Sequence, residues 1–259
     1  MESIHDILFA MSYKNSGDWN SIYKMLKEKV PITHQDIQEA YSRTDCSCLT
    51  ITDNGYPENF KSVWKPPLTI FYKGDISLLE NRKMLAVVGS REPSQYTAET
   101  LIKLIRDVCR LDPGITIVSG LARGVDAIAM RTALDCGARV IGVMGSGLEN
   151  IYPDTSKDIY DRCASGSGLV ISEYPGETPP RKEHFPFRNR LIASLSRCIL
   201  ACQVGEKSGT YITIRYGLDL GKSIALIPQR LEDGEITGQL VRDGALLVSD
   251  AYDIVKEVS

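Results

Sequence analysis

A basic and aromatic segment in the last third of the chain has the clearest chemical character. Residues 181–197 read RKEHFPFRNRLIASLSR and hold five basic residues against one acid, in a chain whose net charge is −3. Phe185 and Phe187 lie within this segment, on either side of a proline. Clustered cations with interleaved rings suit an unpaired polynucleotide, because the cations neutralise phosphates and the rings stack on bases. A solvated helix start with structural aromatics is the alternative interpretation.

Glycine-containing turns follow most of the apolar segments that look like strands. They read VVGSRE (87–92), VSGLARG (118–124), GVMGSGLENIYP (142–153), ISEYPGE (171–177) and QVGEKSGT (203–210). In an open parallel sheet such turns line the carboxyl edge, where ligands bind. Glycine lets backbone amides approach a ligand, and the helix that follows offers unpaired N–H groups to a phosphate. One such turn could reflect turn geometry alone, whereas five on one edge favour phosphate binding.

Several catalytic signatures are missing from the sequence. It contains no G-x-x-x-x-G-K-[ST] loop, and the glycines at 142, 145 and 147 are spaced G-x-x-G-x-G rather than G-x-G-x-x-G. Of three histidines only His184 lies near the predicted edge, and no G-x-S-x-G element accompanies it. Asp126 and Glu173 could form a carboxylate pair, but each follows a strand end, where acids often bind backbone amides. We therefore expect structural roles for both.

The elements that must position these residues follow an alternating pattern. Short apolar segments are predicted as strands at 68–72, 84–88, 115–118, 139–143, 169–171, 198–202 and 223–227. Helical patterns lie between most of them, at 96–111, 125–136, 154–163 and 211–220. This alternation predicts an α/β fold, Rossmann-like, with a mostly parallel sheet and helices on both faces. The strands are apolar throughout, as in a sheet covered on both sides.

The N-terminal part of the chain has a different character. Residues 1–45 predict short helices, the third capped by Thr33 and Asp36. This part is too small for a core of its own, so we expect a small helical domain that packs on the rest. Residues 46–67 show little periodicity and are interpreted as a connecting segment. Residues 68–259 then form the Rossmann-like domain.

The bulk composition narrows the class of protein. A hydrophobic content of 43% and a charged content of 24% over 259 residues are ordinary for a globular protein. No apolar segment approaches the roughly 20 residues that cross a bilayer, and the N-terminus carries acids where a signal peptide carries bases. The seven cysteines include no C-x-x-C pair, which indicates reduced thiols and predicts a cytoplasmic protein without a metal.

The turn sequences, taken in order, resemble the DNA-processing protein A family (DprA/Smf), which acts on incoming single-stranded DNA in bacteria. The matching stretches are VVGSRE (87–92), SGLARGVDAIA (119–129), GSGLENIYP (145–153), SEYPGETPP (172–180), KEHFPFRNRLIA (182–193), KSGTYITIRYGLDLGK (207–222) and QLVRDGALL (239–247). The resemblance covers roughly residues 50–250, and its FP-x-RNR-x-I-A element is the most specific part.

The resemblance implies an extended Rossmann-like domain preceded by a SAM-like helical domain. It also implies a non-enzymatic protein that has no cofactor, protects single-stranded DNA and helps to load a RecA-type recombinase. A homodimer is implied as well, and Leu240, Val241 and Leu246 could give it an apolar surface. Some members carry a winged-helix domain after the sheet. We expect none here, because only a short helix at 250–258 follows the last predicted strand.

The resemblance further implies a basic pocket for single-stranded DNA. In it Arg91 would fork phosphate oxygens, Lys182 would contact a phosphate and Phe185 would stack on a base. Their alternative roles are a salt bridge between loops, a solubilising lysine and a core aromatic. Of Arg188 and Arg190 we expect one to face DNA and the other to brace loops. The full predicted DNA-binding set is Gly89, Ser90, Arg91, Ser119, Gly120, Lys182, Phe185, Arg188, Asn189 and Arg190.

The chain departs from the family pattern at five positions, which strand order places on the edge opposite or beside the basic segment. They are Met130, Ser156, Gln203, Gln229 and Gly238, where histidine, asparagine, glutamate, glycine and asparagine are common. These departures argue against a nucleotide-like or catalytic use of that part of the edge and leave the GSR and FP-x-RNR elements intact. Two rival functions stay open. One is a nucleotide-sensing or N-glycoside-cleaving Rossmann-like protein, although Ser208–Gly209–Thr210 is followed by no nearby glutamate. The other is a scaffold that has lost its ligand.

Overall fold

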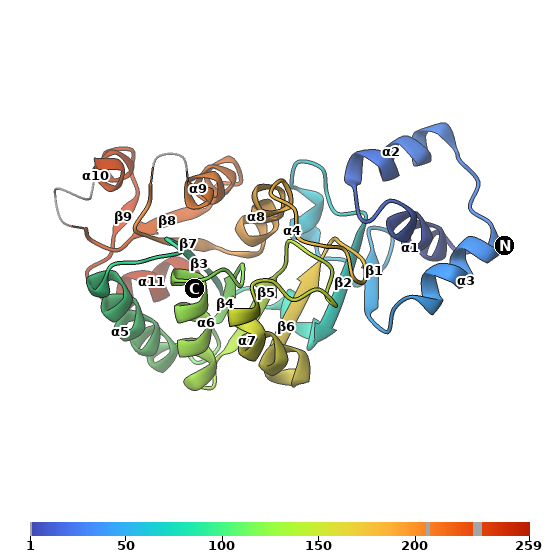
Figure 1. The fold of residues 1–259 in the computed structure, drawn as a ribbon. Coiled ribbons are helices and arrows are strands. Elements are labelled where there is room, and N and C mark those ends of the chain that lie inside the picture. The colour runs from blue at the N-terminus through green and yellow to red at the C-terminus, as the bar shows by residue number, and fades with distance from the viewer. Residues whose placement is uncertain (1, 206–207, 230–234) are drawn as a thin grey trace.

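A nine-stranded sheet runs through the computed structural model, which describes residues 2–205, 208–229 and 235–259 (Figure 1). The strands are β1 (Ser47–Thr50), β2 (Thr69–Gly74), β3 (Met84–Gly89), β4 (Thr116–Ser119), β5 (Arg139–Val143), β6 (Gly168–Ser172), β7 (Cys198–Cys202), β8 (Ser223–Leu226) and β9 (Leu246–Leu247). Their order is β1-β2-β6-β5-β4-β3-β7-β8-β9. The β1–β2 and β2–β6 pairs are antiparallel and the others are parallel. The predicted mostly parallel sheet is confirmed.

Helices cover both faces of this sheet (Figure 1). They are α1 (Ile4–Lys14), α2 (Trp19–Glu28), α3 (His34–Ser42), α4 (Glu58–Lys61), α5 (Gln95–Leu111), α6 (Val125–Asp135), α7 (Lys157–Arg162), α8 (His184–Leu195), α9 (Gly209–Asp219), α10 (Glu235–Arg242) and α11 (Ala251–Val258). Leu85 and Val87 of β3 pack in a buried cluster with α5, α6 and α11, whereas Ala86 and Val88 pack in a second cluster with α8 and α9. Successive side chains of a strand point to opposite faces, so a strand covered on both sides must be apolar throughout.

The strand order creates a place for a ligand at β3. From β3 the chain passes through β4 and β5 to β6 on one side, then returns to β7 on the other side of β3. Loops leave the carboxyl ends of neighbouring strands in opposite directions where the order reverses, which opens a crevice. The turns after β3, β4 and β5 therefore meet at this edge.

The N-terminal helices pack against the far end of the sheet. The capping residues of α1, α2 and α3 are Ser3, Asp18 and Thr33, and the side chain of each accepts a hydrogen bond from a backbone N–H in the first turn of its helix. The predicted capping box of Thr33 and Asp36 is present. The ring of Phe9 lies 6.0 Å from that of Phe71 on β2, so α1 shares its buried surface with the sheet. The domain boundary at residue 45 stays a prediction.

The segment 46–67 is more structured than a connection. Ser47–Thr50 forms β1, which pairs antiparallel with β2, and Glu58–Lys61 forms α4, whose Phe60 is fully buried. Interpreting this segment as a simple linker was wrong, because a four-residue edge strand is stabilised by its partner strand and leaves little periodicity in the sequence. All seven cysteines are free. No helix in the described part of the chain is long and apolar enough to span a membrane.

Candidate nucleic-acid interface

A hollow at the carboxyl edge of the sheet brings together several residues that the sequence singled out. Its lining includes Arg91 after β3, Gly120 and Arg123 after β4, Tyr152 after β5, and Phe185 and Arg188 from α8. We call it the Arg91 pocket. Three guanidinium groups and two aromatic rings thus converge from four separate segments of the chain.

Arg91 and Phe185 form the exposed part of this pocket. The guanidinium carbon of Arg91 lies 5.9 Å from the centroid of the Phe185 ring, within the range of a cation–π contact. The Phe185 ring is partly exposed and lies 5.7 Å from the ring of Tyr152, so it is not a core aromatic. A Cβ at Gly145 would come within 3.0 Å of this ring, so the β5 turn fits closely against Phe185.

Arg188 forms the floor of the pocket. It is 4% exposed and donates hydrogen bonds to the carbonyl oxygens of Gly120, at 2.9 Å, and Val143. Its Nε is buried without a hydrogen-bond partner among the described residues. Burial lowers the pKa of Arg188 to about 10, which leaves the group charged at neutral pH, and the neighbouring Asp126 opposes the shift. Arg188 therefore joins the β4 and β5 turns and also presents positive charge to the hollow.

Asp126 stabilises the β4 turn that lines the Arg91 pocket. Its carboxylate accepts the backbone N–H groups of Gly120, at 3.0 Å, and Ala122, at 3.4 Å. Burial raises the pKa of this carboxyl group, while the charge of Arg188 and the two N–H groups act in the opposite direction. The expected structural role of Asp126 fits these contacts.

Arg190 is held entirely inside the protein. It is 0% exposed, and its guanidinium donates to both carboxylate oxygens of Glu173 at 2.6 and 2.5 Å. It also donates to the carbonyl oxygens of Trp64 and Lys65. The prediction of Arg190 as a direct DNA contact is therefore wrong, because the guanidinium is sealed by the segment after α4. Glu173 has the structural role that we expected.

Two further residues of the predicted set are also buried. Ser119 is 0% exposed and its Oγ donates to the carbonyl oxygen of Val87 at 2.6 Å. Asn189 is 9% exposed and its Nδ2 donates to the carbonyl oxygen of Gly209 at 3.1 Å. Ser119 thus joins β4 to β3 and Asn189 joins α8 to the start of α9, so neither serves as a direct DNA contact.

Other members of the predicted set lie around the pocket. Ser90 shapes the β3 turn, since its Oγ accepts the N–H of Glu92 at 3.1 Å. Gly89 has no room for a side chain, because a Cβ would lie 2.3 Å from the carbonyl oxygen of Cys202. Lys182 is exposed in the loop before α8 but does not line the hollow. The structure thus brings Arg91 and Phe185 together and does not include Lys182 in the pocket lining.

Sequence reasoning missed Arg123 and Tyr152. Both are exposed, Tyr152 by 48% of its surface, and both lie in turns already identified as phosphate-binding candidates. The turn sequences supplied the signal, but only the fold shows which side chain of each turn faces the hollow.

The five departures from the family pattern are not all on the edge, as strand order had suggested. Met130 is fully buried within α6, and Gly238 lies within α10. Ser156 is 1% exposed, whereas Gln203 accepts the N–H of Ser94 at 2.8 Å and braces the β3 turn. Gln229 lies after β8, and its Nε2 donates to the carbonyl oxygen of Ile227 at 3.4 Å. Placing Met130 on the edge was wrong, because its side chain lies on the buried face of α6 and packs in the hydrophobic core.

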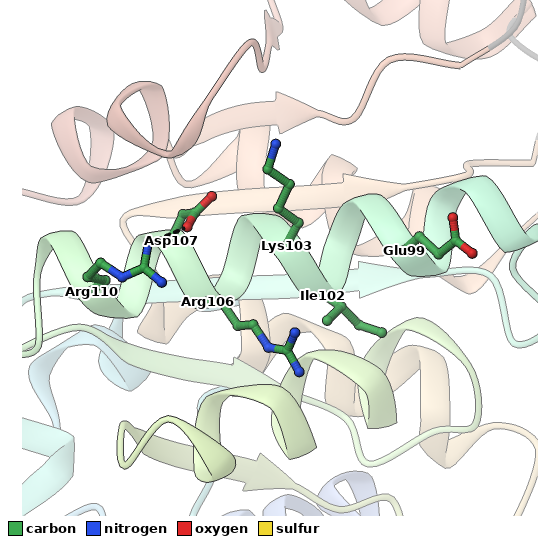
Figure 2. Close-up of a pocket in the computed structure, with 6 residues that line it drawn as sticks. All are labelled: Glu99, Ile102, Lys103, Arg106, Asp107 and Arg110. Atoms are coloured by element: carbon green, nitrogen blue, oxygen red, sulfur yellow. Dashed lines mark hydrogen bonds and ion pairs between the residues drawn. The ribbon is translucent and has the colours of Figure 1, made fainter.

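A second hollow lies on α5, away from the sheet edge (Figure 2). It is lined by Glu99, Ile102, Lys103, Arg106, Asp107 and Arg110. Lys103 and Arg106 extend from different sides of the helix, and Arg110 pairs with Asp107 at 3.1 Å (Figure 2). Acids and bases alternate here without an aromatic ring, so this surface lacks the chemistry of the Arg91 pocket.

Comparison with known proteins identifies the family. The model of the DNA recombination-mediator protein A family matches residues 47–259. The chain belongs to this family. It is 35% identical over 221 residues to the DNA processing protein DprA of Bacillus subtilis, covering 85% of this chain and 73% of that protein. It is 38% identical over 212 residues to DprA of Streptococcus pneumoniae, covering 81% of this chain and 73% of that one.

Solved structures agree with the family assignment. The X-ray structure of DprA from Streptococcus pneumoniae superposes with a TM-score of 0.78 at 31% identity, covering 98% of this chain and 93% of that chain. A Helicobacter pylori DprA structure, described for its single-stranded DNA binding mode, gives a TM-score of 0.73 at 30% identity, with coverages of 83% and 96%. The predicted DprA/Smf resemblance and the Rossmann-like fold are thus confirmed.

Proposed function

We propose that this protein binds single-stranded DNA in the Arg91 pocket and acts in DNA uptake and recombination without catalysing a reaction. The observation that carries the proposal is the guanidinium of Arg91 held over the partly exposed ring of Phe185. The two side chains offer a phosphate contact and a stacking surface next to each other. Arg123 and Arg188 add positive charge to the same hollow.

Relatives support the choice of ligand. DprA proteins of two bacteria are 35% and 38% identical to this chain over the aligned residues, which cover most of its length. The Helicobacter pylori relative is described as binding single-stranded DNA. An unpaired strand also fits the pocket chemistry, since only unstacked bases expose their faces to a ring such as Phe185.

The lining of the pocket supports a binding role over a catalytic one. Among the described residues that line it there is neither a histidine nor a carboxylate. Asp126 lies behind Gly120 with its oxygens directed to backbone N–H groups. A general base must reach the proton that it removes, and this pocket presents none.

The proposal has four further parts: the protein protects incoming DNA, helps to load a RecA-type recombinase, forms a dimer and is located in the cytoplasm. An apolar dimer surface draws support from Val241 and Leu247, which are 36% and 44% exposed. Leu246 is partly buried, and Leu240 is 6% exposed and packs in the core, so it cannot contribute as predicted. A dimer would place two pockets on one strand and raise the effective concentration of the second.

The test is fluorescence anisotropy with a labelled dT oligomer over a salt series, beside a thermal-shift panel of mononucleotides. We expect submicromolar binding at low salt that weakens steeply as salt rises, because each neutralised phosphate releases counterions. Nucleotide-dependent stabilisation without oligomer binding would establish the nucleotide-sensing rival instead. No response to either ligand would support the scaffold that has lost its ligand.

A further inference from the structure

Four aromatic side chains and a lysine from α2, the segment after α4 and the first turn of α8 contact one another. They are Trp19, Tyr23, Trp64, Lys65 and Phe187, and we call them the aromatic platform. The rings of Trp19 and Tyr23 are stacked 4.8 Å apart at 14°. The ammonium of Lys65 lies 4.5 Å from the ring centroid of Trp64 and 5.3 Å from that of Trp19.

Large apolar surface is left open on this platform. Trp64 is 62% exposed and Tyr23 is 51% exposed, although aromatic side chains contribute most when they are buried. Trp64 meets Phe187 edge to face, with ring centroids 6.1 Å apart. Trp64 and Tyr23 therefore present exposed aromatic surface beside the Lys65 ammonium, which lies over the Trp64 ring.

The backbone under the platform is firmly held. Arg190 donates to the carbonyl oxygens of Trp64, at 3.1 Å, and Lys65, at 3.2 and 2.8 Å, while Glu173 neutralises it. Lys65 has φ of 54°, a left-handed conformation that is unfavourable for a residue with a side chain. Such strain persists where the surroundings over-determine it, and it clusters at functional sites. The buried Arg190–Glu173 pair thus fixes the backbone that carries the exposed Trp64.

The first turn of α8 contributes one ring to the Arg91 pocket and another to the platform, on different sides of the helix. Phe185 and Phe187 lie two residues apart in the first turn of α8, where Phe185 contacts Tyr152 and Phe187 contacts Trp64. Exposed cations occur on the same elements of the chain. Arg181 and Lys182 precede α8, and Lys27 lies four residues beyond Tyr23 on the same face of α2.

We propose that the aromatic platform is a second stacking site for single-stranded DNA, which extends the strand from the Arg91 pocket onto the N-terminal helices. This inference rests on the proposed function. Ring faces that alternate with cations match successive bases and phosphates, and the site is sequence-tolerant because every base has a stacking face. Arg190, which does not touch DNA, is then a positioning residue that holds Trp64 in place.

A length series tests the platform. Affinity is measured by anisotropy for a short dT oligomer of about 6 nucleotides, enough for one site, and for one of about 20 nucleotides. We expect the longer oligomer to bind the wild type more tightly. Trp64→Ala should weaken the longer oligomer by about tenfold, within the range of a lost stacking contact, and the short one far less. Trp64→Phe should restore much of the loss, and Tyr252→Ala, at a 69% exposed aromatic on α11, should change neither affinity.

Intrinsic fluorescence gives an independent measurement that does not depend on removing Trp64. The chain has only two tryptophans, Trp19 and Trp64. In Trp19→Phe, addition of the longer oligomer should quench the emission of Trp64 and protect it from iodide, because a stacked base covers the ring. The short oligomer should do so much less.

The outcomes separate the two proposals. If Phe185→Ala weakens both oligomers while Trp64→Ala weakens neither, the platform does not bind DNA and the pocket does; a protein partner would then be the occupant to test. Equal affinity of the wild type for both lengths also overturns the platform. If the wild type binds neither oligomer, the proposed function itself fails.

Discussion

Arg190 and Glu173 form a doubly hydrogen-bonded ion pair in the protein interior, with side chains that are 1% and 5% exposed. The pair connects α8, the β6 turn and the segment after α4, because the same guanidinium donates to the carbonyl oxygens of Trp64, Lys65 and Phe187. The Arg190 guanidinium also lies 3.7 Å from the centroid of the Phe187 ring. Arg190, which the sequence suggested as a DNA contact, thus holds together three segments of the chain from inside the protein.

Breaking this pair should destabilise the protein strongly. Glu173→Gln leaves a guanidinium buried without its counter-charge, which costs about 3–5 kcal/mol of unfolding free energy. Urea denaturation followed by circular dichroism measures this change. The exposed pair of Asp107 and Arg110 is the control, and Asp107→Asn should cost less than about 1 kcal/mol. Equal costs for the two variants would show that the buried pair is not structural.

Arg91→Ala should weaken DNA binding mainly through charge. Loss of one phosphate contact should lower affinity about tenfold and reduce the slope of log K against log salt by about 0.7, the value for single strands. Anisotropy titrations over a salt series measure both. Arg106→Ala removes an exposed arginine of α5 that does not line the Arg91 pocket, and should leave the slope unchanged (Figure 2). An unchanged slope in Arg91→Ala would mean that Arg91 meets no phosphate.

Phe185→Ala should weaken DNA binding without changing the salt dependence. A lost base stack costs about 1–3 kcal/mol of binding free energy, and no charge is removed. Phe185→Tyr keeps a flat ring over the same turn and should retain most of the affinity. The comparison uses the same titrations, and a flattened slope in Phe185→Ala would show that the variant had displaced Arg91 instead.

Gly120→Ala should disturb the pocket floor. A Cβ at this position would lie 2.6 Å from Nη2 of Arg188, a buried group that cannot easily move because it donates to two carbonyl oxygens. Overpacking of this kind costs about 1–3 kcal/mol, so both the unfolding free energy and DNA affinity should fall. Gly55→Ala is the matched control, since its Cβ would only touch Leu49 at 3.8 Å. Thermal melting and anisotropy together reveal the difference.

The stability of the fold should decrease in mild acid through His184. Burial lowers the pKa of His184 below its usual 6.5, while its ring stacks on Tyr174 and its Nδ1 donates to the carbonyl oxygen of Gly145 at 3.1 Å. Between the lowered folded pKa and 6.5 the unfolded chain binds more protons than the folded chain. The contribution of the neutral His184 to the unfolding free energy is therefore fully present above pH 6.5. It decreases as the pH falls below that value.

Urea denaturation at a series of pH values checks this expectation. His184→Phe keeps a ring against Tyr174 but cannot titrate, so its unfolding free energy should change less over the same interval. The carboxyl groups with lowered pKa values, such as Asp53 and Asp112, act at more acidic pH and do not interfere. Identical pH profiles for wild type and variant would contradict the assignment to His184.

The sequence by itself determined the sheet, its turns and the region of the site. Apolar strands and capped helices are local patterns, so the strand segments from β2 to β8 and the Thr33 capping box were predictable from neighbouring residues. The glycine turns located the edge for the same reason. The strand β1 was not predictable, because its stability comes from pairing with β2 more than fifteen residues away.

Only the tertiary structure decided which side chains of the basic segment face solvent. Phe185 turns outward to Arg91 and Tyr152, whereas Arg188 and Arg190 turn inward. The partners of the two buried arginines, at Gly120, Glu173 and Lys65, are between 17 and 125 residues away along the chain. The sequence pattern records charge and spacing. The desolvation of each arginine is balanced by carbonyl and carboxylate groups that only the folded chain brings within reach.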